Sequence, residues 1–499
     1  MIMFRSRCKL FNISRFYVSS FYSTQTMVSS SSSSSSSSFP SVLQKRILMS
    51  GDPRTSMVPI LNQWVEEEKG RDITQSQLQH LIKRLSHFRR FNHALQVSEW
   101  MTNERKYDLS PGDIAKQLNL ISKVHGLEQA KKFFQGIPDA KIGFKVCAAL
   151  LSCYAEHKSL DEAEAIMKKV KEYHPVHITV CYNMMLKLYA QVGKYEKLER
   201  LMQEMKDKDI CNGASFTIRL NAYVAAADIE GMEKLLMWME ADPIATVDWY
   251  TYTTAANAYI KAGDFEKATA MLKKSEQLAR GKTRRLAYES LQTMYAAIGN
   301  KDEVYRIWNR CKIFKSSYNS SSISMLSSLV KLDDIDGAEN LVEEWESKCT
   351  HFDTRIPNLM ITAYCKWGLL DKAEAYIKRL LDSGKKLDGS TWDRFAFTYR
   401  MGNDMDKAVK SMKKAISEDR PGWKPNPFTL VACIKYAKEK EELDLALELL
   451  SLCRKHGHIS VATYDGLASY VHSEILDTKA FDLIKGDYQL DEKIQLLEG

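Results

Sequence analysis

Residues that interrupt regular structure are scarce in this 499-residue chain, which contains 22 glycines and 11 prolines. Such scarcity excludes collagen-like and low-complexity disordered proteins and favours long helices. Hydrophobic residues make up 44% of the chain, yet no window approaches 18 consecutive apolar residues. We therefore expect a helical protein without a membrane span.

Closely spaced cysteine pairs are also absent. The ten cysteines occur singly and none forms a C-x-x-C pair, which argues against a zinc site and against a disulfide framework. We interpret them as small buried hydrophobic residues in a reducing compartment. The sequence predicts no metal site and no cofactor.

Acidic residues are missing from the first 51 residues, which contain six of the 71 lysines and arginines. The rest of the chain has 65 bases and 63 acids, so the net charge of +8 falls to +2 without this segment. Because the summed field of the body is weak, nucleic-acid binding would have to rely on local basic patches.

The opening segment has the composition of an organellar transit peptide. It is acid-free, carries spaced arginines and contains ten consecutive serines from Ser29 to Ser38. Arg15-Phe16-Tyr17 resembles a mitochondrial processing site. We predict import into mitochondria, with chloroplasts as the alternative and a tail without an address as the third reading. Folded structure is expected to begin near Asp52.

One motif recurs through the rest of the chain: a small or aliphatic residue, flanked by acids and lysines and followed by two apolar positions. The recurring residues are Ala94, Ala130, Ala163, Leu198, Met232, Ala268, Val304, Ala338, Ala373, Ala408, Ala446 and Ala480. Their mean spacing is about 35 residues, so the motif divides the chain into twelve units.

Each unit has the pattern of two amphipathic helices. In the fourth unit, Met185, Leu188 and Tyr189 precede Gly193, and a second apolar set at i, i+3, i+4 and i+7 begins at Leu198. Neither helix could bury its apolar stripe alone. Stacked units would bury these stripes, which predicts an all-α fold: an α-solenoid of about twelve 35-residue helix–turn–helix repeats with a concave groove. We expect it to wind as a right-handed superhelix.

We expect four regions along the chain. These are an organellar transit peptide at 1–51, an N-terminal capping helix at 52–74, the repeat solenoid at 75–486 and a C-terminal capping helix at 487–499. The two caps would hide the stacking faces of the terminal units.

The residue pattern of the fourth unit is similar to that of one known repeat. Cys181-Tyr182-Asn183-Met184-Met185-Leu186, the later Gly193 and Glu204-Met205 at the end of the second helix resemble the pentatricopeptide repeat. The resemblance covers roughly residues 54–486, and the chain is similar to plant organellar pentatricopeptide proteins of the P-type class. It implies a ligand, single-stranded organellar RNA, that composition and period do not reveal.

The resemblance also implies how RNA is bound. The first helix of every unit lines the groove, and one nucleotide is read by a unit's fifth residue together with its last. The RNA runs 5′ to 3′ from the N-terminal units. An amide or hydroxyl can hydrogen-bond the edge of an unpaired base, and a neighbouring carboxylate or amide fixes which edge is favoured.

A small set of polar residues occupies these reading positions. The candidate readers are Asn183, Thr217 with Asp248, Thr253, and Asn358 with Asp388. Thr217 with Asp248 resembles the guanine-preferring pair of the family, and Asn358 with Asp388 resembles its uracil-preferring pair. The alternative for an isolated Asn or Thr on a helix is a solvated surface residue.

Other units are less clear. Asn183 resembles a pyrimidine reader whose partner is either Asn212 or Gly213, because its unit is one residue short. Several fifth positions are apolar, which puts their base reading in doubt: Ala115, Ala148, Ile323 and Val431. Thr253 and Glu289 offer a weak and a repulsive reader.

Two further sets of groove residues follow from the resemblance. Flat apolar residues before the reader would sandwich the bases: Val180, Tyr250, Leu286 and Phe428. Lysines eight places after the reader would contact phosphates: Lys123, Lys261, Lys331 and Lys366. The alternatives are packing between units for the first set and ordinary solvated lysines for the second.

Segments that resemble catalytic motifs are incomplete. His472-Ser473-Glu474 matches the H-x-E of a zinc deaminase, but no cysteine follows it. Gly281-Lys282-Thr283 ends like a phosphate-binding loop, but the first glycine and a preceding strand are lacking. We therefore predict no catalytic residues.

Two functions remain in competition. The leading hypothesis is a non-catalytic, sequence-selective RNA-binding protein, expected to be a monomer, that affects transcript stability, processing, splicing or translation. The alternative is a helical-repeat scaffold whose partners are other organellar proteins, which the apolar fifth positions and the low net charge favour. A continuous positive strip along the groove would support RNA, whereas an apolar or acidic groove would support a protein ligand.

Overall fold

The structure is a computed structural model that describes residues 46–47, 56–67, 73–173, 178–242, 245–312, 318–349, 352–418, 423–473, 482 and 484. Every regular element among these residues is a helix. Ala480, the expected helix at 487–499 and all of the expected leader except Arg46 and Ile47 lie outside the described residues.

The helices follow one another in pairs, one pair to a unit. After α3 (Val58–Glu67), the first six pairs are α4 (Gln75–His87) and α5 (Phe91–Asn103), α6 (Pro111–His125) and α7 (Leu127–Gln135), α8 (Phe144–Glu156) and α9 (Leu160–Glu172), α10 (Thr179–Gln191) and α11 (Tyr195–Asp207), α12 (Gly213–Ala226) and α13 (Ile229–Ala241), and α14 (Trp249–Ala262) and α15 (Phe265–Leu278).

The C-terminal half continues the same order. Five more pairs are α16 (Arg284–Ile298) and α17 (Lys301–Cys311), α18 (Tyr318–Lys331) and α19 (Ile335–Lys348), α20 (Arg355–Lys366) and α21 (Leu370–Asp382), α22 (Gly389–Met401) and α23 (Met405–Ser417), and α24 (Pro427–Glu439) and α25 (Leu443–Lys455). Helix α26 (Val461–His472) begins a twelfth unit. The expected α-solenoid of about twelve helix–turn–helix units is confirmed. Gly281–Thr283 forms a short 3-10 turn before α16, between two units.

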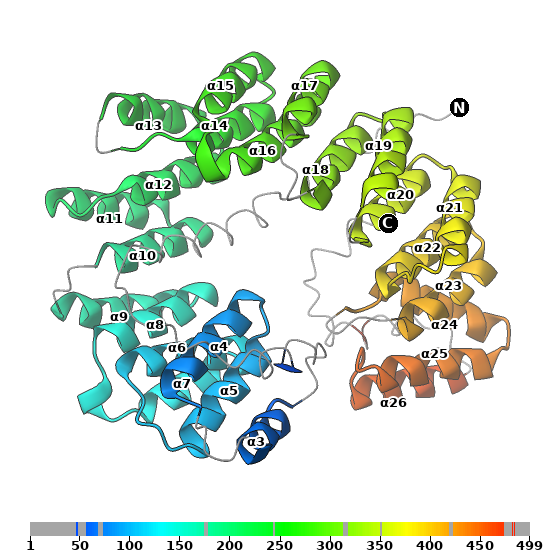
Figure 1. Cartoon of the computed structure of the whole chain (residues 1–499), viewed down its shortest axis with the longest axis horizontal. Coiled ribbons are helices and arrows are strands. Elements are labelled where there is room, and N and C mark those ends of the chain that lie inside the picture. Colours follow the sequence, from blue (N-terminus) through cyan, green and yellow to red (C-terminus); the bar gives the residue numbers. More distant parts are fainter. Residues whose placement is uncertain are drawn as a thin grey trace.

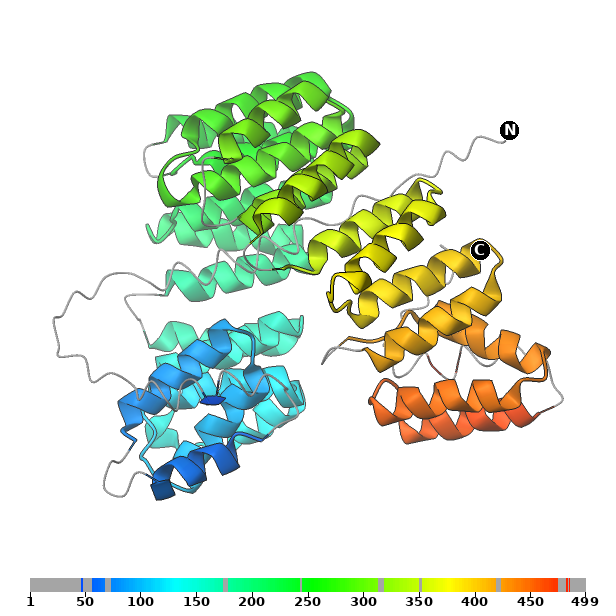
Figure 2. The same cartoon turned by 45° about the vertical axis from the view of Figure 1, so that its right-hand side comes forward.

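From the second unit onward, consecutive first helices pack against one another. From α6 to α26, each even-numbered helix makes close backbone contacts with the next even-numbered helix. Between consecutive second helices of the described units, extensive contact of this kind occurs only at α23 and α25. The stack therefore curves with the first helices on its concave side. Figures 1 and 2 show the curved path, with α16 inside and α17 outside in Figure 1.

The recurring small or aliphatic residue of each unit is buried. Its exposed fraction is 0–1% at all eleven described positions, from Ala94 to Ala446. These residues lie on the second helices, and two apolar clusters together run along the whole stack. The motif found in the sequence thus marks the packed face of the second helix.

Each hairpin turn contains a residue with left-handed backbone conformation. The φ angle is 73° at Gly193 and 83° at Gly263, where glycine has no Cβ to clash. Other turns have a non-glycine residue with positive φ, namely Arg89, Lys158, Ala227, Asp333, Asn403 and Glu441. The packing of the two helices therefore imposes this geometry even where it costs about 1 kcal/mol.

Ion pairs connect consecutive second helices on the outer side of the curve. Glu164 of α9 accepts hydrogen bonds from the Tyr189 hydroxyl of α10 at 3.0 Å and from Lys197 Nζ of α11 at 2.6 Å. The same Tyr–Glu–Lys arrangement recurs at Glu233, Glu339 and Glu374. Because these links are partly exposed, solvent screening weakens each of them.

Glu204 gives the interface of the third and fourth units a pH dependence. Burial alone would raise the pKa of its carboxyl, but hydrogen bonds from Lys171, Lys208 and Tyr182 lower this pKa to about 2. Such a carboxylate stabilises the fold above its unfolded pKa of 4.5 and loses this contribution as the pH falls toward 2. We expect Glu204→Gln to lower the free energy of unfolding by about 1–2 kcal/mol at pH 7, after allowance for solvent screening.

Chemical denaturation between pH 7 and pH 2 measures this effect, and the difference from the wild type should shrink below pH 4.5. Glu196→Gln is the matched control, because Glu196 lies on the same helix, is 90% exposed and lies 3.6 Å from Arg200. Equal losses for the two variants would contradict the role assigned to Glu204.

Two residues extend the packed structure into the segment assigned to the leader. Ile47 has no exposed surface, and its carbonyl accepts a hydrogen bond from Arg90 Nη1 at 3.1 Å. Arg46 Nη1 lies 2.7 Å from Glu67 Oε2. Contacts of the first unit thus begin before Asp52, while the boundaries of the leader and the caps stay predictions.

Candidate nucleic-acid interface

The last residue of a unit reaches the groove because it caps the first helix of the next unit. Asn212, Asp248 and Asp388 are the N-caps of α12, α14 and α22, and each side chain accepts a hydrogen bond from the backbone N–H three residues later. Neighbouring first helices are in contact. The cap can therefore meet the fifth residue of the preceding first helix.

Asn358 and Asp388 show this contact most completely. Asn358 Nδ2 donates to Asp388 Oδ1 at 3.1 Å and to Ser390 Oγ at 3.1 Å. The Thr391 hydroxyl donates to the amide oxygen of Asn358. Both Nδ2 hydrogens are thus used within the protein, whereas the amide oxygen has a second lone pair for a ligand. The half-buried amide is thus held by hydrogen bonds on the concave side of the stack.

Asn183 has the corresponding contact in the fourth unit. Its Nδ2 donates to Asn212 Oδ1 at 3.3 Å, and its Oδ1 accepts from Ser215 Oγ at 2.7 Å. The structure therefore pairs Asn183 with Asn212, the first of the two partners left open by the sequence, and not with Gly213. One amide hydrogen and one lone pair of Asn183 remain, although the side chain is only 9% exposed.

Thr217 and Asp248 are arranged differently. The Thr217 hydroxyl donates to the Gly213 carbonyl of its own helix at 2.9 Å. Asp248 is exposed and accepts from the Thr251 N–H at 2.9 Å. No hydrogen bond joins the two residues in the described part of the chain. A base could contact the hydroxyl oxygen and the carboxylate separately, because the two groups are not hydrogen-bonded to each other.

Thr253 does not present its hydroxyl to the groove. Its side chain is 3% exposed, and the hydroxyl donates to the Trp249 carbonyl at 2.7 Å and lies 3.0 Å from Ser275 Oγ. In the next unit Glu289 is also 3% exposed, bound by Arg285 Nη1 and by Ser321 Oγ, each at 2.8 Å. Both fifth residues are therefore buried and hydrogen-bonded within the protein. Thr253 is not among the readers proposed below.

The contact between fifth and last residues extends to a unit that the sequence analysis did not select. Asp393 Oδ1 accepts from the backbone N–H of Asn426, the N-cap of α24, at 3.0 Å. Burial raises the pKa of Asp393 to about 6, against the opposing effect of this hydrogen bond. Among the described residues, hydrogen bonds between a fifth residue and the cap of the next first helix thus occur at Asn183, Asn358 and Asp393.

The four residues expected to sandwich bases differ in exposure. Val180 is 55% exposed at the start of α10. Tyr250 and Leu286 are half-buried and pack against the core, and burial raises the pKa of the Tyr250 hydroxyl. Phe428 is also half-buried. Val180 is the most open to a base among the four.

The four lysines lie toward the C-terminal ends of the first helices, eight residues or about 12 Å along the helix axis from the fifth positions. Lys123 Nζ is 2.7 Å from Glu156 Oε2, and Lys366 Nζ is 2.7 Å from Asp333 Oδ1. Lys261 is exposed. Lys331 is exposed as well, although desolvation by nearby protein atoms lowers its pKa.

Hydroxyl groups that hold the readers were missed by the sequence analysis. Ser215 and Thr391 are third residues of their helices and bind both the N-cap and the reader of the preceding unit. Their signal is the capping spacing, Asn212-x-x-Ser215 and Asp388-x-x-Thr391. In these two units the hydroxyl joins the cap and the reader, whereas at Asp248-x-x-Thr251 the Thr251 hydroxyl donates to Asp248 Oδ1 at 3.0 Å.

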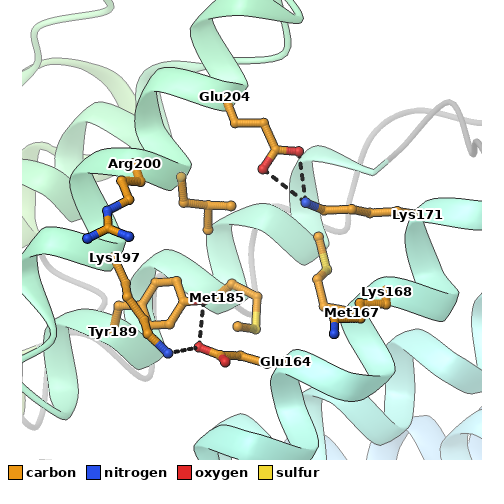
Figure 3. A pocket seen from close by; sticks show the side chains of 10 residues that line it. Glu164, Met167, Lys168, Lys171, Met185, Tyr189, Lys197, Arg200 and Glu204 are labelled. Carbon is orange, nitrogen blue, oxygen red and sulfur yellow. Dashed lines mark hydrogen bonds and ion pairs between the residues drawn. The ribbon is translucent and has the colours of Figure 1, made fainter.

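A shallow pocket lies on the outer side, between α9, α10 and α11. Figure 3 shows Lys197 directed at Glu164 and Lys171 directed at Glu204 across it. Its acids are thus held in ion pairs between units, above the buried Met185. The pocket belongs to the interface of the third and fourth units and not to the groove.

Among the residues that the structure describes, no three His, Cys, Asp or Glu side chains are grouped as metal ligands would be. No helix of these ranges is long and apolar enough to cross a membrane. The nine described cysteines are free, and burial raises the pKa of Cys153 to about 11.

This chain is similar in sequence to known repeat proteins. The PPR repeat family matches residues 146–174, 180–210, 250–278 and 356–384. A mitochondrial pentatricopeptide repeat-containing protein of Arabidopsis thaliana is 42% identical over 457 residues, covering 91% of this chain and 92% of that protein. A second mitochondrial protein of the same description and organism is 33% identical, covering 79% and 80%. Maize PPR10, solved with an 18-nt psaJ RNA element, aligns over 88% of this chain and 72% of its own at 17% identity and a TM-score of 0.41.

Proposed function

Because the chain belongs to the pentatricopeptide repeat family, we propose that its concave face binds single-stranded organellar RNA selectively and without catalysis. The observation that carries this proposal is the Asn358–Asp388 pair, an amide held at the groove by the cap of the next unit. Bound transcripts would be affected in stability, processing, splicing or translation. The succession of units with a period of about 35 residues supports the P-type class.

The hydrogen-bonding capacity of Asn358 supports a preference for uracil in the ninth unit. Its amide hydrogens are used by Asp388 and Ser390, so its oxygen is the group that faces a base. Uracil carries a hydrogen on N3 and can donate to this oxygen, whereas cytosine presents an acceptor at N3. With cytosine at this unit, its N3 and the Asn358 amide oxygen would be two acceptors facing each other.

A mitochondrial location is part of the proposal. It is supported by the acid-free, serine-rich opening and by the relatives whose names place them in mitochondria. A chloroplast address is the alternative that this composition also permits.

Selection from a random single-stranded RNA pool tests base reading. We expect enrichment of guanine, three poorly specified bases and then uracil, because Thr217/Asp248 and Asn358/Asp388 lie in the fifth and ninth units and the fifth positions between them are closed or apolar. The control is Thr217→Ala combined with Asn358→Ala, which should abolish enrichment at these two bases. A pool without guanine and uracil at this spacing would contradict base reading by these pairs.

A protein-binding scaffold is the second candidate function. It is favoured by the closed side chains of Thr253 and Glu289 and by the ion pairs of Lys123 and Lys366. If the pool experiment yields no enriched RNA, this function becomes the leading one.

A further inference from the structure

Two of the four groove lysines are neutralised by acids of the groove edge. Lys123 Nζ lies 2.9 and 2.7 Å from the two carboxylate oxygens of Glu156. Lys366 Nζ donates to Asp333 Oδ1 at 2.7 Å and to the Val330 carbonyl at 3.1 Å. In both pairs the two residues are 33 positions apart. Each acid therefore belongs to the unit next to that of its lysine.

Both acids lie where a first helix ends and the hairpin turn begins. Glu156 ends the first helix α8, eight residues after Ala148, where other units have a lysine. Asp333 is the left-handed residue of the turn after α18, with φ of 53°. The side chains of Lys123, Glu156, Lys366 and Asp333 are 32%, 48%, 44% and 66% exposed, so all four are open to a ligand.

We propose that Glu156 and Asp333 are built-in counter-ions that limit the affinity of the groove for RNA. This inference rests on the proposed function. An RNA phosphate that approaches Lys123 or Lys366 has to displace a carboxylate at hydrogen-bond distance or share the lysine with it. Each acid thus cancels one favourable phosphate contact, and the affinity depends more strongly on the two base-reading pairs than on charge.

Removing one acid should strengthen RNA binding in a salt-dependent way. For single strands, each additional neutralised phosphate steepens the slope of log affinity against log salt by about 0.7. We expect Glu156→Gln and Asp333→Asn each to bind RNA about five-fold more tightly at about 0.1 M salt, with the gain vanishing near 1 M. Asparagine tolerates the left-handed turn, and its side-chain oxygen retains the hydrogen bond from Trp367 Nε1.

The experiment titrates the full-length protein with an unstructured RNA of about 20 nucleotides at several salt concentrations. Glu230→Gln is the matched control, because it breaks an exposed Glu–Lys pair with Lys234 on a second helix, outside the groove. It should leave affinity and slope unchanged. In a Lys123→Ala background, Glu156→Gln should no longer strengthen binding, whereas Asp333→Asn should still do so.

The outcomes separate this inference from the proposed function. Wild-type binding with unchanged slopes in Glu156→Gln and Asp333→Asn would overturn the counter-ion role and leave RNA binding intact. A gain that persists in the Lys123→Ala background would also overturn it, because the lysine would not be the group released. Absence of RNA binding by the wild type and by both variants at low salt would overturn the proposed function and this inference together.

Discussion

Replacing Ala373 by glutamate is expected to lower the free energy of unfolding of the C-terminal units by several kcal/mol. Ala373 has no exposed surface and lies on α21, which packs against α20 of the same unit. A glutamate there would overfill the packed interface and bury a carboxylate without a partner, a change that costs about 3 kcal/mol or more. Chemical denaturation followed by helical circular dichroism measures the loss.

Ala375→Glu is the matched control for this substitution. Ala375 lies two residues along the same helix and is exposed, so the same chemical change should alter stability by about 0.5 kcal/mol or less. Each unit contacts mainly its neighbours, so hydrogen exchange in Ala373→Glu should accelerate near α20 and α21 and stay unchanged in α4 to α9. Equal acceleration in those distant helices would contradict the picture of a linear stack.

The fold was predictable because one buried position recurs in every repeat. A residue buried between two helices must be apolar, and at most of these positions it is alanine, so its recurrence from Ala94 to Ala446 reveals the units. The turns were less visible. Gly193 and Gly263 mark two of them, but Lys158, Ala227 and others adopt the same left-handed conformation without a glycine. Tertiary packing, and not local preference, decides those positions.

The state of a reader depends on residues outside its own helix. Thr217 and Thr253 occupy the same place in their units, yet only the Thr253 hydroxyl is buried, where it meets Ser275 of α15. A pattern limited to the fifth and last residues of each unit does not include Ser275. The partner of Asn183 was likewise ambiguous by counting, because the unit is short, and was decided by the capping of α12 by Asn212.

The charge of the groove could have been anticipated more closely. Lys123 with Glu156 and Lys366 with Asp333 share a separation of 33 residues, slightly less than one repeat period. Side chains separated by about one period lie side by side in a solenoid. A search for opposite charges at this spacing would have identified both ion pairs from the sequence.

Asn358→Thr should change the base preferred by the ninth unit from uracil to guanine. A threonine at this position is expected to behave like Thr217, whose hydroxyl donates to the carbonyl four residues earlier. The hydroxyl oxygen would then face the groove as an acceptor, and Asp388 would lose its hydrogen bond from the Asn358 amide. Two acceptor groups fit the N1–H and the exocyclic amino group of guanine, which are both donors.

The expected size of this switch is about 1–3 kcal/mol in favour of guanine, or about 5- to 150-fold in relative affinity, if base readout in protein–DNA complexes is a fair guide. Competition between two RNAs that differ only at this base measures it. Asn257→Thr is the matched control, since Asn257 lies on the first helix α14 outside the fifth position and should leave the preference unchanged. A retained preference for uracil in Asn358→Thr would show that the amide does not read this base, because the partner Asp388 is the same in both proteins.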